Sequence, residues 1–205
     1  MVRNCTRIKK RIYLACEGGD VGTEGRYIYS LCQTYSCMLL YIRKDSLDPK
    51  SLADAAIDFA HRNAGLPKKS EIWIVFDNDF PEKARQAFEL VKRYNNSRKR
   101  GEAFINIAFN SPVVETWGLL SCGLKNIPNT KERCQSELHR RMPKYIHQRR
   151  SNTSSRPEFD FTMMEAGYSS ALKQAQAWHS SLVDQEEYSV TPYAGIFKLV
   201  KSIKN

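Results

Sequence analysis

Four acidic residues are spaced so that their side chains can act together on a metal ion. They follow three apolar runs typical of β-strands: Glu17 after IYLAC, Asp77 and Asp79 after IWIVF, and Glu115 shortly after FINIAF. Because the carboxyl ends of parallel strands meet at one edge of an α/β sheet, we expect these carboxylates to converge there. Like charges at short range raise one another's pKa unless a cation joins them, and hard oxygen ligands favour Mg²⁺ or Mn²⁺. The sequence therefore predicts a divalent-metal site.

The acidic pair Asp77 and Asp79 after a hydrophobic strand is compatible with three unrelated chemistries. These are the Toprim metal-dependent nucleases, the phosphotransferases of the haloacid-dehalogenase type, and sugar transferases that hold a nucleotide diphosphate through a metal. The structural alternative is a capped turn, which accounts for Asp79 ahead of Pro81 but leaves Asp77 unexplained. Haloacid-dehalogenase enzymes usually carry the acid pair near the first strand and need a later lysine and a second acidic pair, neither of which is evident in this sequence. Sugar transferases need no acid after the opening strand, the position of Glu17.

The basic residues are concentrated in two parts of a chain whose formal net charge is +10. Carboxylates that hold a metal beside basic surfaces suit a phosphodiester substrate, because the basic side chains attract its backbone. Solvated helix faces are the alternative explanation of such clusters. The candidate nucleic-acid contacts are Arg98, Lys99 and Arg100 in the first cluster, and Arg140, Arg141, Lys144, Arg149 and Arg150 in the second.

The order of elements predicts an α/β fold. Apolar runs at 12–16, 37–42, 72–76 and 104–109 alternate with helical segments, two of which begin at Asp48-Pro49 and at Pro81. Strands alternating with helices of this length indicate a parallel sheet with helices on both faces. After Lys125 the alternation gives way to helical segments, the clearest at 162–183 and 196–203. We therefore predict a catalytic core at 1–125 and a helical, basic extension at 126–205 packed on it.

Three motifs taken together resemble one known family. They are Cys16-Glu17-Gly18 with Thr23-Glu24, the pair Asp77 and Asp79, and the stretch NSPVVETWGLL that carries Glu115 and Trp117. In this order and spacing they resemble the RloB-like branch of the Toprim superfamily, over roughly residues 12–122. The resemblance implies a Toprim-like Rossmannoid sheet with a C-terminal helical extension.

The same resemblance implies a function and roles for the acids. It implies a metal-dependent nuclease of a prokaryotic anti-phage defence system that cuts RNA, with tRNA favoured, or DNA. An ABC-type or AAA-type ATPase encoded nearby would control it. Asp77 and Asp79 would hold the principal Mg²⁺ or Mn²⁺, Glu17 would act as general base or share a metal, and Glu115 with Glu24 would complete a second site.

Other features limit the function classes. No apolar run approaches the ~20 residues that a membrane span requires, and the basic start has no signal-peptide core, so we expect a cytoplasmic protein without membrane contact. Two alternatives stay open: a non-catalytic subunit that binds nucleic acid or the ATPase, and a phosphotransferase acting on a small nucleotide. A homo-oligomer also stays open.

Overall fold

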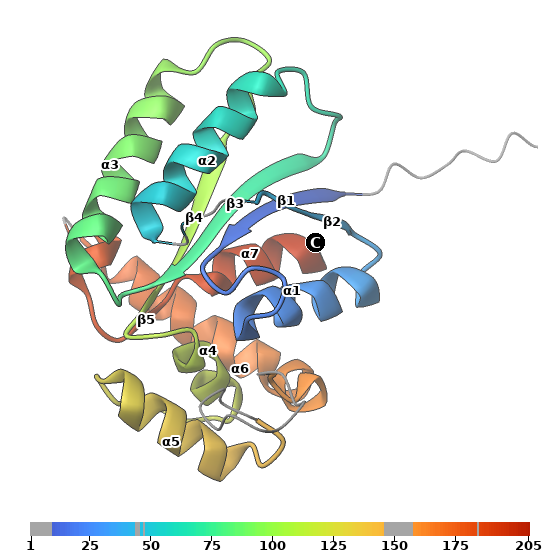
Figure 1. Ribbon diagram of the computed structural model, residues 1–205. Helices are drawn as coiled ribbons and strands as arrows, with labels where there is room; N and C mark the ends of the chain where they lie inside the picture. The colour runs from blue at the N-terminus through green and yellow to red at the C-terminus, as the bar shows by residue number, and fades with distance from the viewer. Residues whose placement is uncertain (1–9, 44–45, 47, 146–157, 184) are drawn as a thin grey trace, which may run out of the picture.

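The computed structural model describes residues 10–43, 46, 48–145, 158–183 and 185–205. Its centre is a sheet with the strand order β2-β1-β3-β4-β5, in which the first four are parallel and β5 is antiparallel to β4 (Figure 1). The strands are β1 (Arg11–Cys16), β2 (Met38–Tyr41), β3 (Ser70–Asp77), β4 (Ile105–Ser111) and β5 (Tyr193–Ala194).

Helices cover both faces of this sheet. The helices are α1 (Thr23–Thr34), α2 (Pro49–Arg62), α3 (Pro81–Ser97), α4 (Glu115–Ser121), α5 (Lys131–Arg141), α6 (Phe161–Ser180) and α7 (Ile196–Lys204), with a short 3₁₀ turn η1 (Glu187–Ser189). Helices α2 and α3 lie on one face and α1 and α7 on the other, while α4, α5 and α6 pack together beyond the strand ends (Figure 1). The predicted α/β class with a mostly parallel sheet is confirmed.

The alternation of side chains along the strands divides the core into two layers. In β3, Ile72, Ile74 and Phe76 face α2 and α3, whereas Trp73 and Val75 face the layer of α1, α4 and α7. All five side chains are at least 95% buried. Strands buried on both faces require nearly continuous apolar sequence, which is why IWIVF identified this strand.

The C-terminal residues contribute to the sheet itself. Tyr193 and Ala194 pair with Ser111 and Asn110 at the end of β4, and α7 packs against β4 and α1. The short strand β5 was not predicted, because two residues carry no periodic signal. The boundary at residue 125 stays a prediction. In the part of the chain described here, no helix has the length and apolar character needed to span a bilayer.

Helices α4 and α6 make an unusually close contact at Gly167. A Cβ atom placed on Gly167 would lie 1.8 Å from the carbonyl oxygen of Ser121. Real contacts of this kind are never so short, so any larger residue must push the two backbones apart. Glycine at this position therefore sets the spacing between α4, which begins at Glu115, and α6.

We predict that Gly167→Ala destabilises the protein by about 1–3 kcal/mol despite the higher helix propensity of alanine, because overpacking outweighs that gain. Urea-induced unfolding followed by circular dichroism measures the change. Ser170→Ala, on an exposed position of the same helix, is the matched control and should change the free energy of unfolding by less than about 0.5 kcal/mol. Equal stability of the two variants would contradict the contact.

Candidate metal and nucleic-acid site

The acids lie where the topology of the sheet opens a crevice. From β1 the chain crosses to β2 on one side and then returns to β3 on the other, so β1 and β3 are neighbours whose connections diverge. Ligands of α/β proteins bind at such a switch point, outside the carboxyl ends of the strands. Glu17 directly follows β1, and Asp77 is the last residue of β3.

A tight glycine loop places Glu24 beside Glu17. The backbone N–H of Asp77 donates to Glu17 Oε2 (3.3 Å), and the N–H of Gly18 donates to Glu24 Oε1 (2.7 Å). A Cβ atom on Gly22 would lie 2.4 Å from Cα of Gly18, so the loop closes only with glycine there. The backbone thus supplies donors to two carboxylates of the predicted set.

The carboxyl groups perturb one another. Burial raises the pKa of Asp77 well above its ordinary range, and the charges of the carboxyls at Glu24, Glu115 and Glu17 raise it further. Burial also raises the pKa of Glu17 to about 7, to which the charges of Glu24 and Asp79 contribute. The pKa values of Glu24 and Glu115 are raised, mainly by burial. The structure therefore brings all five predicted acids into one electrostatically coupled group.

Lys131, the first residue of α5, neutralises part of this negative charge, and Tyr145, just beyond the end of α5, donates a hydrogen bond to one of the acids. Lys131 Nζ forms an ion pair with Asp79 Oδ2, and the hydroxyl of Tyr145 donates to Glu115 Oε1. Tyr145 is fully buried. Burial lowers the pKa of Lys131, but the bond to Asp79 and the nearby carboxylates outweigh this and leave it raised. The sequence did not predict either of these contacts with the acids.

Asn110 connects the site to the C-terminal helix. Its Nδ2 donates to Asp77 Oδ1 (3.4 Å), and its Oδ1 accepts a hydrogen bond from the backbone N–H of Ile196, the first residue of α7 (3.2 Å). Asn110 is fully buried. The motif around it was recognised in the sequence, but this positioning role was not.

The donor set fits a hard divalent cation by its chemistry. Carboxylate oxygens that raise one another's pKa are relieved by a cation, and such oxygens are what Mg²⁺ and Mn²⁺ prefer. Asn78, between Asp77 and Asp79 in the sequence, also carries a buried oxygen, Oδ1, that has no hydrogen-bond partner. No three acidic, histidine or cysteine side chains in the described ranges are arranged around one point as metal ligands. Binding would thus require the ion pair of Asp79 or the carboxyl rotamers to rearrange.

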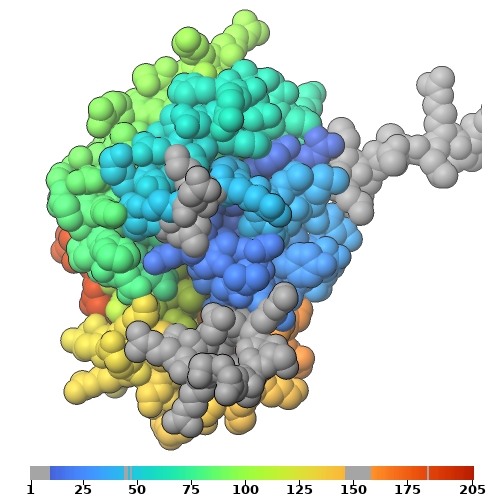
Figure 2. All heavy atoms as spheres, in the orientation of Figure 1, coloured from blue at the N-terminus to red at the C-terminus, as the bar shows by residue number. Residues whose placement is uncertain are grey.

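The helix that carries the second basic cluster begins beside the acids. This helix, α5, begins at Lys131, which contacts Asp79, and in the space-filling view the yellow surface of α5 adjoins the green surface at the start of α3 (Figure 2). Some of its charge is neutralised internally, because Arg140 and Arg141 both pair with Glu137. Lys144 lies 3.5 Å from Asp160 and is largely exposed. Arg149 and Arg150 lie outside the described residues.

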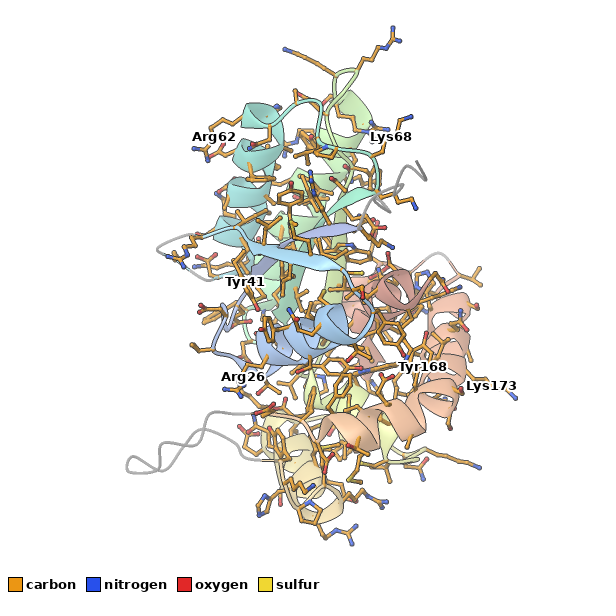
Figure 3. The ribbon with its side chains drawn as sticks, turned by 90° about the vertical axis from the view of Figure 1, so that its right-hand side faces the viewer. Arg26, Tyr41, Arg62, Lys68, Tyr168 and Lys173 are labelled. Carbon is orange, nitrogen blue, oxygen red and sulfur yellow. The ribbon has the colours of Figure 1, made fainter. Side chains whose placement is uncertain are left out.

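The first basic cluster lies at the opposite edge of the sheet. Helix α3 starts near the acids, runs back along the strands for 17 residues, or about 25 Å, and ends just before Arg98, Lys99 and Arg100. Arg62 and Lys68 lie at the same end of the molecule (Figure 3). The structure therefore does not bring this cluster together with the acids, and only a substrate longer than about 25 Å reaches both.

The fold and site define an α/β protein with a carboxylate cluster at the switch point of its sheet. A family model described as RloB-like protein matches residues 12–203. The chain belongs to the RloB-like family, which confirms the resemblance seen in the sequence. Neither the curated proteins nor the solved structures contain a significant match.

The raised pKa of Glu17 predicts a pH-dependent stability in metal-free protein. Because the folded-state pKa is about 7 and the ordinary value is 4.5, the folded state holds a proton that the unfolded state releases between these values. The free energy of unfolding should therefore fall as pH rises from 4.5 to 7. The Glu17→Gln variant has no carboxylate whose charge must be buried. It should therefore be more stable than the wild type by about 1–3 kcal/mol at pH 8 and equally stable at pH 4.

Chemical unfolding at several pH values in EDTA measures this difference. Glu132→Gln, which changes an exposed acid of α5, is the control and should follow the wild type throughout. A Glu17→Gln variant with the stability profile of the wild type would contradict the burial of the Glu17 charge.

The ion pair of Lys131 predicts the direction of an effect on metal binding. An ammonium group that neutralises Asp79 opposes the approach of a cation, so Lys131→Met should tighten Mn²⁺ binding about tenfold by calorimetric titration. Lys125→Met removes the same charge from an exposed loop and should leave the affinity within about twofold. Unchanged or weaker binding in Lys131→Met would contradict competition between the lysine and the metal.

Proposed function

We propose that the chain is a metal-dependent phosphodiesterase that cuts nucleic acid. The observation that supports this most directly is the coupled group of carboxylates at the switch point of the sheet, with the basic helix α5 next to it. Phosphodiester cleavage requires both features, because a phosphate must be attracted and a water activated within the same crevice. RNA, with tRNA favoured, is the proposed substrate, and DNA is the second choice.

The acids would divide the work between them. Asp77 and Asp79, at the end of β3, would hold the principal Mg²⁺ or Mn²⁺, and Glu24 with Glu115 would complete a second site. When bound, the metal supplies a water of lowered pKa and neutralises charge on the phosphate. Glu17, with a pKa of about 7, is matched to accept a proton from the attacking water near neutral pH. The backbone N–H of Asp77 donates to the carboxylate of Glu17 and holds that carboxylate in place.

The side chains of α5 and of the residues just beyond it would hold the substrate. Arg140 and Arg141 are partly exposed on α5, and Lys144 lies close behind the helix. Contacts of such side chains to phosphate position a nucleic acid without reading its sequence. The basic cluster at Arg98–Arg100 would engage only the distant part of a long substrate such as tRNA.

Membership of the RloB-like family supports a proposal for the cellular setting. A cytoplasmic nuclease of an anti-phage defence system, restrained or triggered by an ABC-type or AAA-type ATPase, agrees with membership of the RloB-like family. Control by a partner would also explain why Lys131 and Tyr145 of the chain itself already contact Asp79 and Glu115. A partner would then have to release these contacts before the acids bind a metal.

A second candidate is a subunit that keeps the acids but does not cut. One observation favours it: among the described residues no three potential ligands surround a common point, and Asp79 and Glu115 both have protein partners. In this case Lys131 and Tyr145 would permanently replace the metal. Metal-dependent cleavage by the purified chain distinguishes the two candidates.

The test is cleavage of tRNA, single-stranded RNA and DNA, and duplex DNA by purified protein with Mg²⁺ or Mn²⁺, alone and with the neighbouring ATPase. Asp77→Ala should reduce the cleavage rate at least ~100-fold and should retain the circular dichroism of the wild type, since removing one of several repelling charges rarely harms the fold. Asp58→Ala, an exposed acid of α2, is the control and should retain full activity. Equal cleavage by Asp77→Ala and the wild type would reject the proposal.

A further inference from the structure

An exposed aromatic ring lies at the acid edge of the sheet. Phe80 directly follows Asp79, is the N-cap residue of α3, and is 50% exposed. Its neighbours along the chain that face the core, Phe76 and Ala84, are at least 99% buried. Leaving half of a phenylalanine in water forgoes part of the free energy that its burial would supply, so the position of this ring has a cost for stability.

The surroundings of the Phe80 ring match the chemistry of a nucleotide. Lys83 Nζ lies 5.7 Å from the ring centroid, so an ammonium group accompanies the aromatic face. The same lysine is half-exposed and approaches Asp48 at 3.4 Å. A second exposed apolar side chain, Val21 (49% exposed), comes from the loop that leaves the neighbouring strand β1. Apolar and basic groups are thus combined at the rim that carries the carboxylates.

We propose that Phe80 is a stacking platform for an unpaired base next to the phosphate that is cut, with Lys83 holding an adjoining phosphate. This inference rests on the proposed function and deepens it, because it defines the substrate as a single strand or an unpaired segment of RNA or DNA. Every base has a flat face that stacks on an aromatic ring, and such stacking tolerates any sequence. In a duplex those faces are already covered by neighbouring bases, and a base is exposed only by flipping it out.

The opposite edge of the sheet provides a matched control. Phe104 is 51% exposed, and Arg98 lies over its ring at 5.8 Å. The two phenylalanines therefore share exposure and a cationic neighbour, but Phe104 precedes β4 at the edge without the acids. A general affinity of exposed aromatic rings for nucleic acid would make the two equivalent, whereas the proposal makes only Phe80 important.

The experiment measures binding separately from cleavage. Fluorescence anisotropy with twelve-nucleotide single-stranded RNA and DNA and with the corresponding DNA duplex is recorded in EDTA, so that no metal-dependent cleavage takes place. Phe80→Ala should weaken single-strand binding about tenfold and duplex binding less than twofold. Phe80→Trp should restore single-strand binding, and Phe104→Ala should bind like the wild type. A single abasic position in the strand should reproduce the loss seen in Phe80→Ala.

Three results would each overturn the platform. They are unchanged single-strand binding by Phe80→Ala, equal losses in Phe80→Ala and Phe104→Ala, and a wild type that binds single strands no better than the duplex. The proposed function is tested separately by adding Mn²⁺. Cleavage that is indifferent to Phe80 rejects only the platform, and tight, Phe80-dependent binding without any cleavage rejects only the nuclease.

Discussion

Mutual repulsion among the carboxylates at the ends of β1 and β3 is the constraint on which the rest of the structure depends. Burial raises the pKa of Glu17, Glu24, Asp77 and Glu115, so the fold must supply donors and positive charge to hold the acids together. It does so from three directions: backbone N–H groups of the strand ends, the hydroxyl of Tyr145 and the ammonium of Lys131. Lys131 and Tyr145, which follow the last parallel strand in the sequence, therefore complete the site at the strand ends.

Sequence reasoning located the strands and the acids because both depend on local patterns. The apolar run before Asp77 identified β3, and parallel topology then placed Glu17 beside it. The contacts of Lys131 and Tyr145 escaped prediction because they depend on how α5 folds back over the strand ends, which no local pattern encodes. The cluster at Arg98–Arg100 was grouped with the acids by charge alone, although the direction of α3 carries it to the other edge.

The two edges of the sheet consequently differ in character. The carboxyl edge combines negative charge with the basic helix α5 and an exposed ring at Phe80, whereas the amino edge presents arginine and lysine with few acids. A long, folded nucleic acid is able to contact both edges at once, and a short one is not. For the proposed nucleic-acid substrate, the amino edge would therefore contribute to affinity only when the ligand is long enough to span the domain.

The bond between Asn110 and Ile196 makes the last helix part of the architecture of the acids. Asn110 binds Asp77 with one end of its amide and the start of α7 with the other. A fused domain or a partner that binds residues 196–204 and displaces α7 would act through this amide on the carboxylate of Asp77. A fusion or a partner attached to α7 is therefore expected to alter the position of Asp77 in the proposed metal site.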